Sequence, residues 1–312
     1  MPDPVLYSQA MIVAAIVSAL CVLIVSWAWP STATANGNLA VTLAVGAGLL
    51  AGYRVLHLRC AWPPVNGLDR LLTIGFPAIF GIELVACWPR VPPWVTRSLR
   101  LLLAASLGRI LLHGSVYLGG PRSTWTTADA FAVLALGSVI LIVAWWLLHQ
   151  LSFRSTGSSV LLALSLSCQT TAITIMLAGY VTGGAAAIPL TAALAGTAVA
   201  SNLFRTPSAL SGAMGIGVVG LFGLLFIGRF FGGISTLQAL TIFLAPLLCG
   251  VTEVPQLRPR KPWQVALVRL GLVAIPLVIV LVGAKRTFDR ETAPLLGTAT
   301  IQSRTAGAQR VI

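Results

Sequence analysis

AMIVAAIVSALCVLIVSWA, residues 10–28, contains no charged side chain and is long enough to cross a lipid bilayer as a helix. Such a helix needs about 20 apolar residues, because the hydrocarbon core is about 30 Å thick. Nine further predominantly apolar runs follow along the chain, at 38–53, 71–88, 98–118, 128–149, 158–180, 185–203, 210–227, 235–251 and 263–282. The sequence therefore predicts an all-α fold, a polytopic transmembrane helical bundle of about nine or ten spans.

Composition supports the same class and divides the chain. Hydrophobic residues make up 57% of the 312 and charged residues only 9%, whereas soluble domains are about 25% charged. We assign 10–283 to the transmembrane helical bundle and 284–312 to a polar C-terminal tail, which we expect to be disordered because it lacks helical periodicity. The first run exceeds the roughly 7–15 residues of a signal-peptide core, so we expect a retained helix in the cell membrane.

Several function classes fit the chain poorly. The formal net charge is +13, but the basic residues are scattered singly between apolar runs, which indicates membrane anchoring and predicts no nucleic-acid partner. The five cysteines form no CxxC pair and have no histidine at metal-ligand spacing, so we expect no metal site. Catalytic and nucleotide-binding motifs such as HExxH, GxSxG and the P-loop are absent. We therefore predict a protein that is not an enzyme and has no catalytic residues and no cofactor.

The third run, 71–88, decides the topology. The connections on both sides of it are basic, with Arg54, Arg59 and Arg70 before it and Arg90, Arg97 and Arg100 after it. Short basic loops gather on the cytoplasmic side, so two adjacent basic loops conflict if this run crosses the membrane. Gly75, Pro77 and Gly81 interrupt the run. We therefore predict that it is re-entrant or broken, and favour nine crossings over ten, with the short basic loops cytoplasmic.

Small residues recur every four positions in three runs, which favours close packing between helices of one chain. The pattern occurs at Gly48 and Gly52, at Ala192, Gly196 and Ala200, and at Ser211, Ala213, Gly215 and Gly217.

A few polar residues inside apolar runs are candidates for a substrate or ion path, because ionisable groups are costly in a membrane. Arg109 lies near the middle of the run 98–118, and His113 and Tyr117 follow on the same helix face. Glu83 is the expected counter-ion of Arg109, with Asp129 as second choice. Gln169, in the run 158–180, is expected to face inward. The ion pair has two interpretations, a structural pair or part of a solute or proton site.

Two functions remain open. In the first, the protein is a small-solute permease with its polar site on the fourth helix, where Arg109 binds a small anionic solute or His113 relays a proton. In the second, it is a non-catalytic membrane subunit or scaffold that docks a membrane protein partner. We favour the permease, because polar stripes within membranes are kept for solutes or protons more often than for packing.

Overall fold

The structure, a computed structural model, describes residues 4–28, 34–58, 61–118, 125–154, 158–203, 210–253 and 262–308. Within these ranges the chain is helical and has no strand, which confirms the predicted all-α bundle. The helices are α1 (Pro4–Ala28), α2 (Thr34–Val55), α3 (Gly67–Arg70), the π-helical turn η1 (Leu71–Gly75), α4 (Phe76–Ala86), α5 (Pro93–Leu112), α6 (Thr127–Arg154), α7 (Ser158–Leu177), α8 (Val181–Leu203), α9 (Ser211–Phe231), α10 (Thr236–Leu244), the 3₁₀ segment η2 (Ala245–Glu253) and α11 (Pro262–Ala308).

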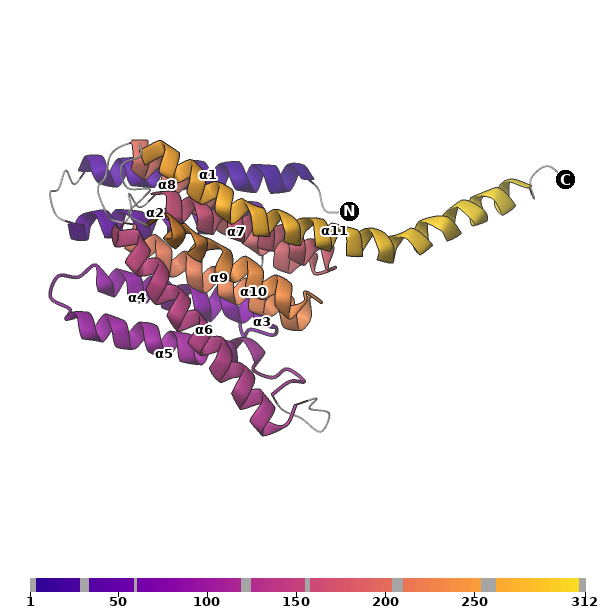
Figure 1. Ribbon diagram of the computed structural model, residues 1–312, viewed down its shortest axis with the longest axis horizontal. Helices are drawn as coiled ribbons and strands as arrows, with labels where there is room; N and C mark the ends of the chain where they lie inside the picture. Colours follow the sequence, from indigo (N-terminus) through magenta and orange to yellow (C-terminus); the bar gives the residue numbers. More distant parts are fainter. Residues whose placement is uncertain are drawn as a thin grey trace.

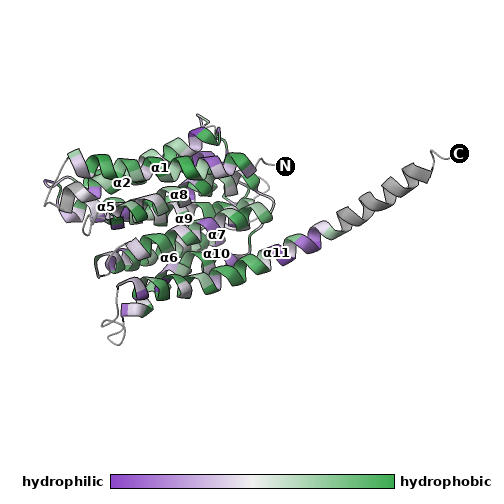
Figure 2. Cartoon of the chain, turned by 90° about the horizontal axis from the view of Figure 1, so that it is seen from above, coloured by the Kyte–Doolittle hydropathy of each residue, from purple (hydrophilic) through white to green (hydrophobic). Residues whose placement is uncertain are grey.

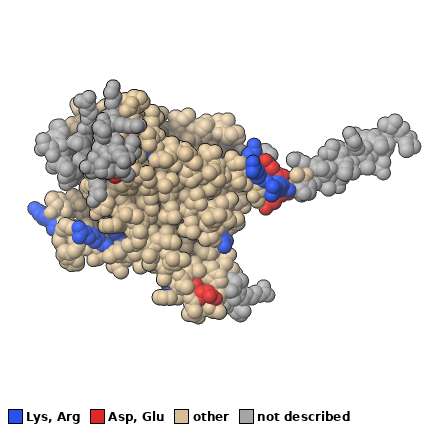
Figure 3. Space-filling view, viewed as in Figure 1, with Lys and Arg blue, Asp and Glu red and all other residues tan. Residues whose placement is uncertain are grey.

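The helices lie side by side and run back and forth between two ends of the bundle (Figure 1). We name these the α4–α5 end, at the left of Figure 1, and the α2–α3 end, at the right, after the connections that lie there. Eight helical segments in the described residues are long and apolar enough to cross a membrane. Apolar residues cover the sides of the bundle (Figure 2), and on the face seen in Figure 3 the charged residues gather toward the ends. The protein is therefore a multi-pass membrane protein.

Helix α9 is the centre of the bundle, and it packs against α2, α4, α5, α6, α7, α8 and α10. Nearly all its residues are buried. A β-carbon at Gly215 would overlap Glu83 of α4, and one at Gly217 would overlap Leu164 of α7. The small-residue pattern of this run therefore marks close helix contacts within the chain, as the sequence predicts. The peripheral helices α1, α6 and α11 leave large apolar side chains exposed along their outer faces, where lipid would contact them.

The third apolar run reaches from one end of the bundle to the other as an interrupted helix, so of the two predicted forms, re-entrant or broken, the structure has the broken one. Residues 67–86 form one helical segment, α3–η1–α4, whose break is the π-helical turn. At 1.5 Å per residue this segment is about 30 Å long. A β-carbon at Gly67 would lie 3.1 Å from both Leu111 and Phe231, at the ends of α5 and α9. Glu83 contacts Arg100 and Gly215, toward the starts of those same helices. Within the described ranges, the chain thus forms ten antiparallel segments between the two ends.

The C-terminal segment begins as a continuation of the last helix, and the expected disorder of the tail 284–312 stays a prediction. Helix α11 continues through the polar residues after Val282 to Ala308 and projects from the bundle (Figure 1). Extending an existing helix avoids the cost of nucleation, which is the costly step for an isolated segment. Lys285 and Asp289 are also spaced by four residues, so opposite charges share one helix face.

Candidate functional site

Glu83 of α4 is the centre of a buried ion pair with Arg100 of α5. Only 1% of the Glu83 side chain is exposed, against 17% for Arg100. The Arg100 Nε donates to Glu83 Oε1 at 3.1 Å, and Nη2 donates to Oε2 at 2.6 Å. Both carboxylate oxygens therefore accept from one planar guanidinium, the geometry in which such a pair is strongest. This arrangement compensates a carboxylate that would otherwise be costly in the membrane.

Arg109, the partner that the sequence predicted for Glu83, lies elsewhere, and hairpin geometry explains the error. In an antiparallel helix pair, facing residues lie at similar distances from the connection. Glu83 is near the end of α4 and Arg100 is near the start of α5, whereas Arg109 is about 13.5 Å further along α5. Arg109 is therefore in the last turn of its helix, where it is exposed. Asp129, the second predicted partner, caps α6 through Thr126 at the α2–α3 end.

Helices α6 and α9 complete the surroundings of the pair. The Arg100 guanidinium lies over the Trp145 ring, 5.7 Å from its centroid, in a cation–π contact. On the other side, Gly215 of α9 faces the Glu83 carboxylate so closely that a β-carbon there would overlap Oε1. Trp145 is also next to Gly215. Four helices, α4, α5, α6 and α9, thus converge on one ion pair.

A cavity of about 600 Å³ lies between the first turns of α5 and the last turns of α6, and Arg100 forms part of its wall. We call it the α5–α6 cavity. Its residues recur at spacings of three and four along each helix, because one face of each helix lines it. The polar lining residues are Thr96, Arg97, Arg100, His149 and Gln150, and the others are Pro93, Leu101, Ile142, Trp145, Trp146 and Phe153.

Two lining residues have buried polar atoms with unused hydrogen-bonding capacity. Trp145 is 5% exposed, and neither its Nε1 nor the Nδ1 of His149 has a hydrogen-bond partner among the described residues. The His149 ring packs edge-on against Phe153, with centroids 4.9 Å apart. Buried polar atoms without partners cost free energy. A polar ligand or water in the α5–α6 cavity would reduce that cost.

The other predicted candidates do not join this site. His113 follows the last residue of α5 and is exposed, and its carbonyl oxygen accepts a hydrogen bond from the Arg70 guanidinium. The Tyr117 hydroxyl donates to the Phe230 carbonyl oxygen at 3.0 Å. Gln169 lies on α7 with a buried Oε1 that has no partner within the described ranges. Of the five predicted residues, only Glu83 is part of the α5–α6 site, and the predicted stripe from Arg109 to Tyr117 extends beyond the end of α5.

Arg269 of α11, a buried arginine absent from the sequence predictions, forms a second ion pair with the half-buried Glu253. It is 4% exposed, and its Nη2 donates to Glu253 at 2.6 Å. Its Nε donates to Thr252 at 2.6 Å and its Nη1 to Ser159 at 3.0 Å. Since all three nitrogens are bonded within the protein, we interpret this arginine as a clamp between α7, η2 and α11. Its position inside the apolar run 263–282 was the available signal.

Comparisons with known proteins give no family for this chain. No protein-family model matches it, and no curated protein has a significantly similar sequence. Within the described ranges, no three His, Cys, Asp or Glu side chains come together in a way that could hold a metal ion. The geometry of the α5–α6 cavity is therefore the main guide to function.

Proposed function

We propose that the protein is a small-solute permease that binds the anionic group of its solute in the α5–α6 cavity. The observation that carries the proposal is the position of Arg100, which holds a buried carboxylate on one side and lines a cavity on the other. Arg97 adds a second cation to the lining, so the two arginines outnumber Glu83. A volume of about 600 Å³ suits a small organic solute, because ligand pockets are typically about 300–1,000 Å³.

Competition for Arg100 would couple solute binding to proton movement. The guanidinium offers a planar fork that fits a carboxylate or a phosphate. When the solute takes this fork, the Glu83 carboxylate loses its partner in a low-dielectric site, so it becomes more stable after accepting a proton. Solute and proton would then enter the site together. Return of Arg100 to Glu83 would release both.

The role we propose is transport rather than catalysis. Both oxygens of the Glu83 carboxylate, which lies next to the cavity, accept hydrogen bonds from Arg100, and the proton uptake proposed for it accompanies solute binding and breaks no bond in the solute. The alternative role is that of a non-catalytic subunit or scaffold that docks a membrane protein partner. In that role the ion pair would only stabilise the packing of α4 against α5. The packed centre formed by α8 and α9, whose residues are mostly buried, is the observation that favours this alternative.

Uptake into proteoliposomes tests the proposal. A panel of radiolabelled anions, including phosphate, sulfate, acetate and succinate, is offered with and without an inward proton gradient. Arg97→Gln should raise the KM of the transported anion, and Arg100→Lys should lower uptake further because lysine lacks the bidentate fork. Arg109→Gln, an exposed site outside the cavity, is the control and should transport normally. Absence of flux for every anion, or equal effects of Arg97→Gln and Arg109→Gln, would support the scaffold instead.

The sidedness that we propose follows from ten crossings and loop charge. We propose the cell membrane as the location and the α4–α5 end as cytoplasmic. Short loops on the cytoplasmic side carry an excess of lysine and arginine. In sequence, the connections at the α4–α5 end contain Arg90, Arg205, Arg258, Arg260 and Lys261, while those at the other end contain Arg59 and Arg122. The proposal counts the connections alone, since Arg54 and Arg70 lie in the adjoining helices and Lys285, Arg286 and Arg290 lie in α11.

A further inference from the structure

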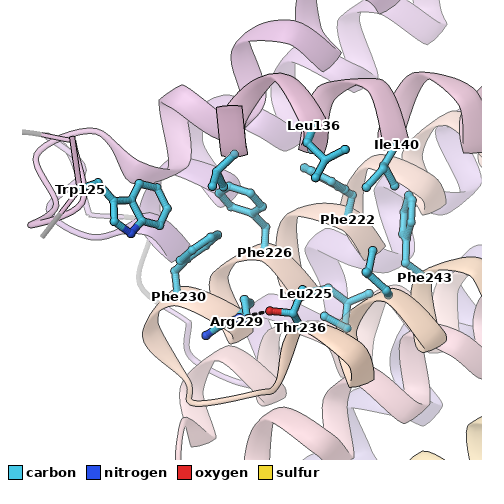
Figure 4. Close-up of a pocket in the computed structure, with 14 residues that line it drawn as sticks. Trp125, Leu136, Ile140, Phe222, Leu225, Phe226, Arg229, Phe230, Thr236 and Phe243 are labelled. Carbon is cyan, nitrogen blue, oxygen red and sulfur yellow. Dashed lines mark hydrogen bonds between the residues drawn. The ribbon is translucent and has the colours of Figure 1, made fainter. Parts of the chain in front are cut away.

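A second cavity, of about 280 Å³, lies between α6, α9 and α10 and is separate from the α5–α6 cavity. We call it the α6–α10 groove. Aromatic side chains from α9 and α10 form one wall, and α6 forms the other (Figure 4). Phe222 stacks on Phe226 at 5.4 Å between centroids and meets Phe243 edge-on at 5.6 Å. Its lining is thus almost entirely apolar, which suits a hydrocarbon chain better than a water-soluble molecule.

Arg229 is the cationic residue of this groove. It is exposed in the last turn of α9. Its Nε donates to Thr236 Oγ1 at 2.7 Å (Figure 4), which ties it to the first turn of α10. Its guanidinium also lies 5.7 Å from the centre of the Phe230 ring. In the described part of the chain no carboxylate pairs with it. These contacts orient the side chain while leaving its positive charge uncompensated.

The groove and the arginine lie at two different depths of the membrane. Arg229 is at the α2–α3 end of the bundle, together with Trp125, and aromatic and basic residues favour the headgroup level. The groove extends from there along α6, where Leu136 is 62% exposed and so faces lipid. One occupant matches this order, a molecule with a negative charge at the headgroup level and an apolar chain below it.

We propose that the α6–α10 groove binds one anionic phospholipid from the bilayer. Its phosphate contacts the Arg229 guanidinium, and one acyl chain lies against Phe222, Phe226 and Phe243. Charge complementarity fixes the headgroup, because Arg229 is a donor without an acid partner. The lipid would join α6 to α10 along the outside of the bundle. This inference does not depend on the transport role.

Native mass spectrometry of the purified full-length protein tests the proposal. The protein, delipidated in detergent, is titrated with phosphatidylglycerol or phosphatidylcholine. We expect one tightly bound phosphatidylglycerol and about tenfold weaker binding for Arg229→Gln, which removes a charge-assisted contact. Arg54→Gln is the matched control, since Arg54 is an exposed arginine in the last turn of α2, at the same end of the bundle.

A second variant tests the groove itself. A β-carbon at Gly137 would lie 3.5 Å from Phe222 and 3.7 Å from Phe226, so Gly137→Leu would fill the space without backbone overlap. Gly137→Leu should abolish tight binding of phosphatidylglycerol. If this variant does not fold, Ala239→Leu fills the same groove from α10. Equal losses for Arg229→Gln and Arg54→Gln, or unchanged binding in both filled variants, would overturn the proposal. The proposal would also be overturned if the parent protein formed dimers and the filled variants did not, because a second copy of the chain would then occupy the groove.

Discussion

Replacing Arg100 should destabilise the protein more than replacing Glu83, although the two side chains share the same bonds. Arg100→Met leaves a carboxylate that is 1% exposed with no cation, and an unpaired buried charge costs about 3–5 kcal/mol. Glu83→Gln leaves an arginine that is 17% exposed and borders a cavity. That arginine keeps one amide acceptor and can reach water, so the cost should be about 1–3 kcal/mol.

The double variant makes the comparison quantitative. Glu83→Gln with Arg100→Met contains neither charge, so it should be at least about 1 kcal/mol more stable than Arg100→Met alone. The free energy of unfolding is measured by titrating each variant with SDS in mixed micelles and following circular dichroism. Arg97→Met is the control, because it removes an exposed arginine one turn earlier on the same helix and should change stability by less than about 0.5 kcal/mol.

Two outcomes would refute this reasoning. Additive losses in the double-mutant cycle would mean that the two side chains do not interact in the membrane. A larger loss for Glu83→Gln than for Arg100→Met would mean that the arginine, rather than the carboxylate, is the more enclosed charge.

Three further predictions concern the packing of two glycines and the topology of the third segment. Gly215→Ala should cost about 1–3 kcal/mol in the same unfolding assay, because its β-carbon would overlap the Glu83 carboxylate. Gly81→Ala on α4, which meets no atom within 4 Å, should be neutral or stabilising by up to about 1 kcal/mol, and equal losses for the two would argue against the close approach. Finally, reporters inserted at 56–66 and at 87–92 should lie on opposite sides of the membrane, and labelling on the same side would restore the re-entrant third segment.

The helical bundle could be predicted because run length and composition alone determine which segments suit a membrane. The ends of the helices were harder to predict. The predicted fourth run, 98–118, begins five residues too late, and this error placed Arg109 instead of Arg100 opposite Glu83. Pro93 occupies the first turn of α5 and Gly114, with φ +67°, follows its last residues. Proline at a helix start and glycine just after a helix end are both readable in sequence. Together, this proline and this glycine predict a fourth helix that begins at 93 instead of 98 and has Arg109 in its last turn.

Partner choice could not be predicted in the same way. Glu83 was identified correctly as a buried acid, yet its contact with Gly215 depends on which helices are neighbours, and apolar periodicity does not encode that. The aromatic contact between Arg100 and Trp145 likewise depends on how α6 leans against α5. His149 lines the α5–α6 cavity, but the sequence indicates only that it ends the run 128–149. A histidine at the end of an apolar run gives no sign of lining a cavity until the facing helix is known.

The two ion pairs also bear on how the chain is inserted into the membrane. An arginine at the centre of a lone helix makes membrane insertion unfavourable by about 2.5–3.5 kcal/mol. Helix α5 contains three arginines, and Arg100 is the one nearest its centre. Glu83 precedes Arg100 by 17 residues and Glu253 precedes Arg269 by 16. During synthesis on the ribosome, each carboxylate therefore emerges before the arginine that it will neutralise. Helices α4 and α5, and likewise η2 and α11, would leave the translocon as pairs.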